Sequence, residues 1–99
     1  MAIERLELPD EQWADIERRP LHGVIRKIAN ETDKASRNDA LAGEDIIITN
    51  LVKHWRVLDG ETGAELPIVR SSYDRIPQEV FTLIVDSCMD VVKAAYPNR

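Results

Sequence analysis

Apolar and polar residues alternate near the start of the chain, and this pattern predicts a β-hairpin over residues 3–16. Leucines alternate with charged residues up to Pro9, a turn-forming segment follows, and apolar residues resume at Trp13. Alternation on both sides of such a turn is typical of two antiparallel strands. Two further apolar arms surround the glycine-containing segment 59–63, so we expect a second short hairpin over residues 56–68.

Apolar residues at helical spacing predict three main helices. The first follows Pro20, and its apolar face consists of Leu21, Val24, Ile25, Ile28 and Ala29. The second begins at Glu44, and its apolar face consists of Ile47, Ile48, Leu51, Val52 and Trp55. The third occupies residues 77–96 and is apolar on more than one face. It therefore lies at the centre of the fold or offers its surplus surface to another chain.

The segment 30–45 differs from its surroundings because it is polar, with only alanines and Leu41 as apolar residues. It is interpreted either as a polar continuation of the first helix or as an exposed loop, and we expect it to be mobile. Together these elements predict one α+β domain over residues 1–99, mainly helical, with about three main helices and two short β-hairpins.

Composition and charge favour a folded, soluble domain. The chain has 99 residues, of which 43% are hydrophobic and 31% charged, as expected for one small globular domain. Its net charge of −5 argues against a surface that neutralises nucleic-acid phosphates. No apolar run approaches the ~20 residues of a membrane span, and the charged N-terminus argues against a signal peptide. We therefore expect a cytoplasmic domain that binds neither nucleic acid nor membrane.

The residues that most often carry chemistry are isolated in this sequence. His22 and His54 are the only histidines, and no paired-cysteine or His-x-x-x-His spacing accompanies them. The single cysteine, Cys88, falls within the apolar pattern of the last helix, which favours a buried thiol. Segment 59–63 has the glycines of a phosphate-binding loop but lacks the lysine and hydroxyl residue that follow them there. We expect no catalytic, metal-binding or cofactor-binding residue, and therefore no enzyme.

The charged clusters are interpreted as hydrated surface. Asp86 and Asp90 lie four residues apart on the polar stripe of the last helix, where like charges repel slightly. The one basic cluster is surrounded by acidic residues, so we expect an exposed face with local ion pairs. This cluster consists of Arg18, Arg19, Arg26 and Lys27.

Five large apolar residues are candidates for contact with another protein. Trp13 and Trp55 are amphipathic groups of the kind favoured as interface anchors, and both also fit core positions of a small domain. Phe81, Met89 and Val92 belong to the last helix, whose apolar surface exceeds what one buried face needs. Spare apolar surface of this kind also predicts self-association.

Three segments resemble proteins of bacteriophage tails. Residues 6–14, Leu-Glu-Leu-Pro-Asp-Glu-Gln-Trp-Ala, resemble the start of many small tail-module proteins encoded by long-tailed bacteriophages. Residues 51–67 are similar to a segment of phage tail assembly chaperones, in which an apolar run and a tryptophan precede a charged glycine turn and a Leu-Pro pair. The serine-containing turn at 71–77 and the helix that starts after it follow in the same order.

This resemblance implies a non-enzymatic phage tail assembly chaperone. Such chaperones bind the tape-measure protein, keep it soluble and help to recruit tail-tube subunits around it. The partners would then be phage tail proteins and further copies of this chain, in the cytoplasm of the host cell. Two alternatives stay open: a structural connector or tail protein that forms a ring in the virion, and a small acidic inhibitor of a host defence protein.

Overall fold

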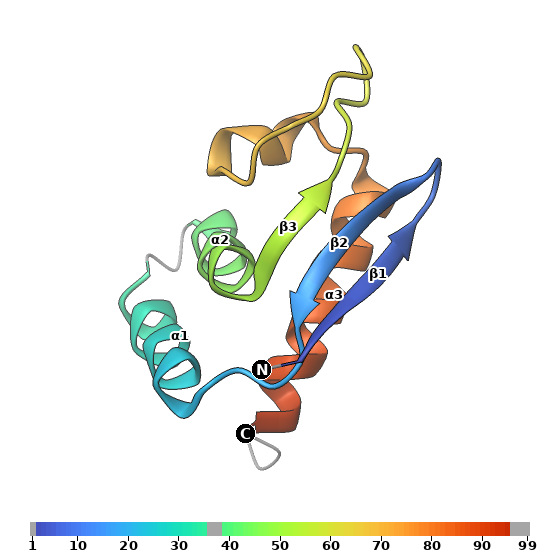
Figure 1. Ribbon diagram of the computed structural model, residues 1–99. Helices are drawn as coiled ribbons and strands as arrows, with labels where there is room; N and C mark the ends of the chain where they lie inside the picture. Colours follow the sequence, from blue (N-terminus) through green and yellow to red (C-terminus); the bar gives the residue numbers. More distant parts are fainter. Residues whose placement is uncertain (1, 36–38, 96–99) are drawn as a thin grey trace.

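The computed structural model describes residues 2–35 and 39–95, which form a three-stranded antiparallel sheet and a layer of helices (Figure 1). The elements follow in the order β1 (Ile3–Leu8), β2 (Gln12–Glu17), α1 (His22–Lys34), α2 (Ala40–Leu51), β3 (Val52–Arg56), the 3-10 helix η1 (Arg70–Arg75) and α3 (Gln78–Ala95). The strand order in the sheet is β1-β2-β3. Figure 1 shows α3 crossing one face of the sheet, with α1 and α2 beside it beyond β3. The expected α+β class is confirmed, and the described residues contain three α-helices and one 3-10 helix.

The core lies between α3 and the inner face of the sheet. Val80, Ile84 and Cys88 of α3 are at most 2% exposed. Ala14 and Ile16 of β2 belong to the same core and are fully buried. A spacing of four residues in a helix and of two residues in a strand puts each set on one face of its element. The last helix therefore lies at the centre of the fold.

The hairpin expected over residues 3–16 corresponds to β1 and β2, although β2 is one residue longer. In its turn, Asp10 and Glu11 have φ angles of 60° and 63°, a left-handed conformation that residues other than glycine rarely adopt. Gln12 closes the turn. Its amide N–H and its Nε2 both donate to the carbonyl oxygen of Pro9, over 3.3 and 2.9 Å.

A β-bulge interrupts the pairing of β3 with β2. The register steps from His54 directly to Val52, so Lys53 is the extra residue. An extra residue breaks the alternation of a strand between its two faces. As a result Val52 and Trp55 both pack against the core although they are three positions apart.

The second helix begins and ends earlier than the sequence predicts. α2 begins at Ala40 rather than at Glu44, because Asp39 caps it by accepting the amide hydrogen of Ala42 over 3.2 Å. It ends at Leu51, and the residues predicted to continue the helix form β3 instead. The bulge gives Val52 and Trp55 the three-residue spacing that is also found on one face of a helix. This spacing explains why the sequence pattern places the end of the helix too late.

The polar segment 30–45 is helical at both of its ends. Its first residues continue α1 to Lys34, as in one of the two interpretations, and its last residues belong to α2. Residues 36–38 lie outside the described residues, and the expected mobility of this segment stays a prediction. The last residue of the predicted helix 77–96 also lies outside them, and α3 is described to Ala95.

The second hairpin, predicted over residues 56–68, forms only a short pairing. Arg56 ends β3, and no second strand follows within this fully described range, although the amide hydrogens of Leu66 and Asp59 bond across the two arms to the carbonyl oxygens of Val57 and Ala64. One isolated bridge joins Leu58 to Glu65. The second arm is mostly exposed and reaches Pro67, which has no amide hydrogen to donate to a ladder. Extended pairing is therefore not sustained along this arm.

We expect Ile84→Asp to unfold the domain and Leu83→Asp to leave it folded. Ile84 is fully buried, so an aspartate there would place an unpaired charge in the core, at a cost comparable to the whole stability of a small domain. The neighbouring Leu83 is 43% exposed, so the same substitution leaves the carboxylate in water. Circular dichroism of both variants measures their helix content. A folded Ile84→Asp variant would contradict the central position of α3.

Glu11→Gly is expected to stabilise the domain by about 1 kcal/mol, because glycine adopts the left-handed conformation without the cost that a side chain adds. Glu11→Ala keeps a side chain at the same φ, so it is the matched control and should give no such gain. Thermal unfolding followed by circular dichroism compares the two variants. Equal melting temperatures would show that this turn stores no strain.

Candidate functional site

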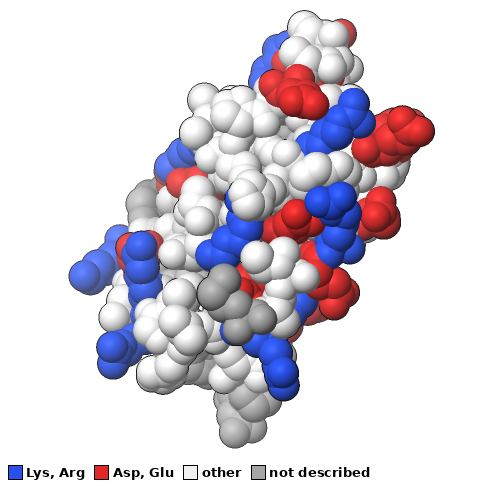
Figure 2. Space-filling view, in the orientation of Figure 1, with Lys and Arg blue, Asp and Glu red and all other residues white. Residues whose placement is uncertain are grey.

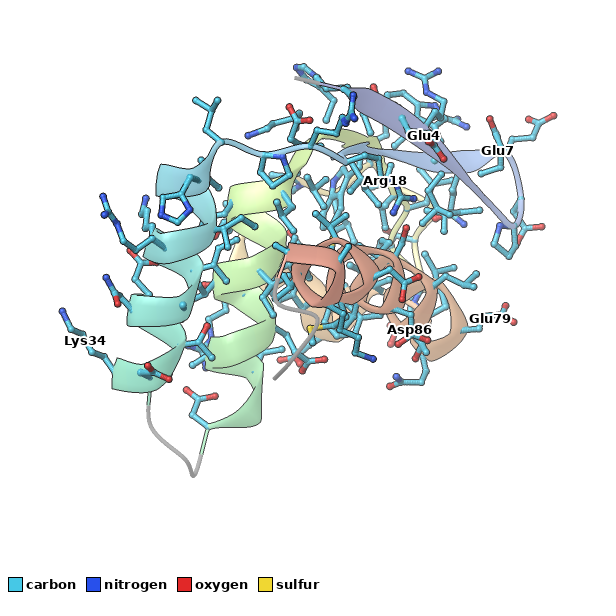
Figure 3. The ribbon with its side chains drawn as sticks, turned by 90° about the horizontal axis from the view of Figure 1, so that it is seen from below. Glu4, Glu7, Arg18, Lys34, Glu79 and Asp86 are labelled. Atoms are coloured by element: carbon cyan, nitrogen blue, oxygen red, sulfur yellow. The ribbon has the colours of Figure 1, made fainter. Side chains whose placement is uncertain are left out.

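An apolar groove lies between α1 and α3 and is the best candidate for a binding site. Its volume is about 310 Å³, and its most buried lining residues are Ile28 and Ile47, which are 3% and 8% exposed. Figure 3 shows the three helices side by side, with α2 between the other two. The groove is lined by Ile28, Ala29, Thr32 and Asp33 of α1, Ile47 of α2, and Met89, Val92 and Lys93 of α3.

Helical periodicity produces the walls of this groove. Ile28 and Thr32 are four residues apart in α1, and Met89 and Val92 are three residues apart in α3, so each pair shares one face of its helix. The hydroxyl of Thr32 donates to the carbonyl oxygen of Ile28 over 2.6 Å. This polar group is therefore satisfied within α1, and the lining of the groove stays mainly apolar.

Charged side chains of opposite sign lie on the two sides of the groove. Asp33 comes from α1 and Lys93 from α3, and both residues are exposed. A partner with an apolar stripe and polar flanks would meet apolar residues inside the groove and charges at its rim.

The five residues predicted to contact partners are not all in one place. Met89 and Val92 lie together in the groove. Trp13 lies on the outer face of the sheet, since Ala14, the next residue of β2, belongs to the core on the other face. Trp55 and Phe81 belong to an aromatic cluster away from the groove.

Three apolar residues of the groove were not among the sequence candidates. Ile28, Ala29 and Ile47 belong to the apolar faces of their helices, a pattern that indicates burial but not which faces meet. No signal in the sequence distinguishes them from core residues. Only the packing of α1 and α2 beside α3 makes these faces part of an open groove.

The ring of Trp13 is covered by Arg5 on the outer face of the sheet. The guanidinium carbon of Arg5 lies 3.8 Å from the centre of the Trp13 ring. The same guanidinium donates to both carboxylate oxygens of Asp15, over 2.8 and 3.1 Å, and these bonds hold the pKa of Asp15 below its usual range. Figure 2 shows basic and acidic side chains interspersed over this side of the molecule, unlike the continuous acidic surface of a nucleic-acid mimic.

Trp55 and Phe81 both contact Tyr73, with ring centres 6.4 and 5.4 Å from it. Tyr73 is 4% exposed, and its hydroxyl donates to Asp45 of α2 over 2.7 Å. Burial and this hydrogen bond raise the pKa of Tyr73 above its usual range, so the hydroxyl keeps its proton. The indole N–H of Trp55 donates to the carbonyl oxygen of Leu66 over 2.7 Å. The aromatic cluster thus ties β3, η1, α2 and α3 together.

Asp59 organises the loop 59–63. Its Oδ1 accepts the amide hydrogens of Glu61 and Thr62 over 2.7 and 3.1 Å, and its Oδ2 accepts from Nε of Arg75 over 2.7 Å. The bond from Arg75 and those from the backbone lower the pKa of Asp59 from 3.8 to about 2. These amide groups bind a carboxylate of the protein itself, so the loop is unsuited to binding phosphate.

The chain is partly buried around the end of β2. Of the predicted basic cluster, Arg19, Arg26 and Lys27 are exposed as expected, whereas Arg18 is half-buried. The guanidinium of Arg18 donates to the carbonyl and hydroxyl oxygens of Ser87 over 3.1 and 2.7 Å, and it reaches from the sheet to α3 (Figure 3). Glu17 is 3% exposed, and its Oε2 accepts the amide hydrogens of Ala2 and Arg19. The bond from Ala2 is the main reason that the pKa of Glu17 lies below its usual range.

The part of the chain that the structure describes contains no group of three His, Cys, Asp or Glu side chains placed to hold a metal ion. Cys88 is fully buried in α3, and burial raises the pKa of its thiol to about 12. This thiol therefore stays neutral near pH 7, and a neutral thiol is a poor nucleophile.

No protein-family model, curated protein or solved structure matches this chain. Among the helices described here, none is both long and apolar enough to cross a membrane. The geometry of the groove is thus the main structural guide to function.

The bonds of Asp59 predict a contribution to stability that is lost in acid. Because the pKa of Asp59 is lowered in the folded protein, its charged form stabilises the fold above about pH 4, and this effect disappears as the pH falls to about 2. The difference in unfolding free energy between the wild type and Asp59→Asn is therefore expected to shrink over this range. Urea unfolding at several pH values measures the difference, with Glu79→Gln as a control at an exposed carboxylate. A difference that is constant with pH would contradict the assignment.

Proposed function

We propose that this protein binds an amphipathic helix of another protein in the groove between α1 and α3, as a phage tail assembly chaperone that acts on the tape-measure protein. The observation that carries the proposal is the apolar lining of the groove, where Ile28, Ile47, Met89 and Val92 share one concave surface. The interaction is reversible and involves no covalent chemistry.

A helix is the partner structure that best fits this groove. An apolar stripe with i, i+3 and i+4 spacing places its side chains into a depression between two other helices. A volume of about 310 Å³ accommodates several such side chains. The exposed charges of Asp33 and Lys93 then face the polar flanks of the bound helix.

The tape-measure protein is proposed as the client because residues 6–14, 51–67 and 71–77 resemble those of phage tail proteins. A long helical client needs its apolar stripes covered until the tail tube encloses it. A groove that covers such a stripe through reversible contacts meets this need. The net charge of −5 favours a soluble complex.

Co-expression with the tape-measure protein of the same phage tests this proposal. Met89→Glu is expected to reduce the co-purified tape-measure protein about tenfold or more, because it places a charge in the apolar groove. A tenfold loss corresponds to about 1.4 kcal/mol of binding free energy.

Leu83→Glu is the matched control, since it makes the same kind of change in the same helix at an exposed residue outside the groove. It is expected to co-purify the client as the wild type does, and circular dichroism verifies that both variants are folded. A wild type that retains no tape-measure protein, or a Met89→Glu variant that retains a full amount, would refute the proposal.

A further inference from the structure

The outer edge of β1 is free of other strands in the described structure. β1 is the first strand in the order β1-β2-β3, so only one of its edges is paired. The carbonyl oxygen of Ala2 accepts the amide hydrogen of Arg18 over 2.8 Å, at the start of the ladder with β2. Hydrogen-bonded and non-hydrogen-bonded pairs alternate along an antiparallel ladder. The backbone groups of Ile3, Arg5 and Glu7 therefore point away from β2, towards the free edge.

We propose that β1 of a second copy of this chain pairs antiparallel with this edge, about a two-fold axis at Leu6, and joins two three-stranded sheets into one. In this register Arg5 lies opposite Glu7 of the second copy, and Glu7 lies opposite its Arg5. Ile3 lies opposite Pro9 of the second copy, which follows β1 and has no amide hydrogen, so the hydrogen-bonded pairs at the centre of the ladder are those of Arg5 with Glu7. Two pairs of opposite charges thus flank two leucines at the axis. This pairing is independent of the proposed groove and its client.

The charges select this register over its neighbours. Residues directly opposite each other share one face of a sheet, so the strands can shift only in steps of two residues. A shift of one step in either direction places Arg5 opposite Arg5, or Glu7 opposite Glu7, and like charges directly opposite destabilise a sheet. Charged residues on an edge strand usually prevent pairing with other chains. Here the order of Arg5 and Glu7 along β1 disfavours the two neighbouring registers and favours the register with Leu6 at the two-fold axis.

The contacts of Arg5 within one copy support this arrangement. Asp15 is in register with Arg5 on one side and with His54 on the other. The bond to Asp15 at 2.8 Å and the stacking on Trp13 hold the guanidinium on the outer face of the sheet. Glu7 lies at the margin of the molecule in Figure 3. In the joined sheet, Glu7 of the second copy lies next to Arg5 on the side away from Asp15. Asp15, Arg5 and this Glu7 then form a row of alternating charge across the strands.

Exchange of the two charges tests the pairing. Light scattering at high protein concentration is expected to give a dimer mass for the wild type and a monomer mass for both Glu7→Arg and Arg5→Glu, because each variant places like charges opposite each other. A mixture of the two variants is expected to regain the dimer mass, since one chain then carries two basic and the other two acidic residues at these positions. A monomeric wild type, a dimeric single variant or a monomeric mixture would each overturn the proposal.

A cysteine at the two-fold axis tests the register without altering these charges. The two Leu6 Cα atoms would be about 4.5 Å apart, which a disulfide spans, so Leu6→Cys is expected to give a covalent dimer on oxidation. Glu4→Cys is the matched control, because its two copies would be about 13 Å apart along the strands. Cys88 is fully buried and does not compete. On non-reducing electrophoresis, equal cross-linking of both variants, or none by Leu6→Cys, would overturn the register.

Discussion

The packing of α3 against the inner face of the sheet determines which surfaces of the molecule are free. Ile84 and Cys88 are fully buried in the core, so one face of this helix is covered by the sheet. The apolar pattern of α3 is wider than that face. Its additional residues, Met89 and Val92, form one wall of the groove opposite α1. A single helix therefore closes the core and forms part of the candidate binding surface, and both features follow from the breadth of its apolar pattern.

The elements with uninterrupted periodicity could be predicted from the sequence. The alternating pattern near the N-terminus correctly predicts β1 and β2, and the helical pattern near the C-terminus correctly predicts α3. The prediction failed between Val52 and Trp55, because the bulge at Lys53 gives two core residues a spacing that a short window cannot distinguish from a helix. The contact of Arg18 with α3 could not be predicted either, because its partner, Ser87, is 69 residues away in the sequence.

The candidate site could be predicted only in part, for a related reason. The breadth of the last apolar pattern pointed to Met89 and Val92, which the structure places together in the groove. The opposite wall, which includes Ile28, could not be found, because periodicity shows that a face is apolar but not which element covers it. Trp55 illustrates the same limit: its size suggested an interface anchor or a core residue, and in the structure it packs against Tyr73.

The groove and the free edge of β1 share no residues, so the two proposed interactions use different surfaces. α1 and α2 lie beyond β3, whereas β1 forms the opposite edge of the sheet (Figure 1). A two-fold dimer through β1 keeps both helical layers on one side of the joined sheet and carries one groove in each copy. A client whose apolar stripes engage both grooves of the proposed dimer gains a second contact that is intramolecular. Such a contact raises the overall affinity by orders of magnitude without any new interaction. Each groove can therefore bind weakly, which suits the proposed client, a tape-measure protein that would be released when the tail tube encloses it.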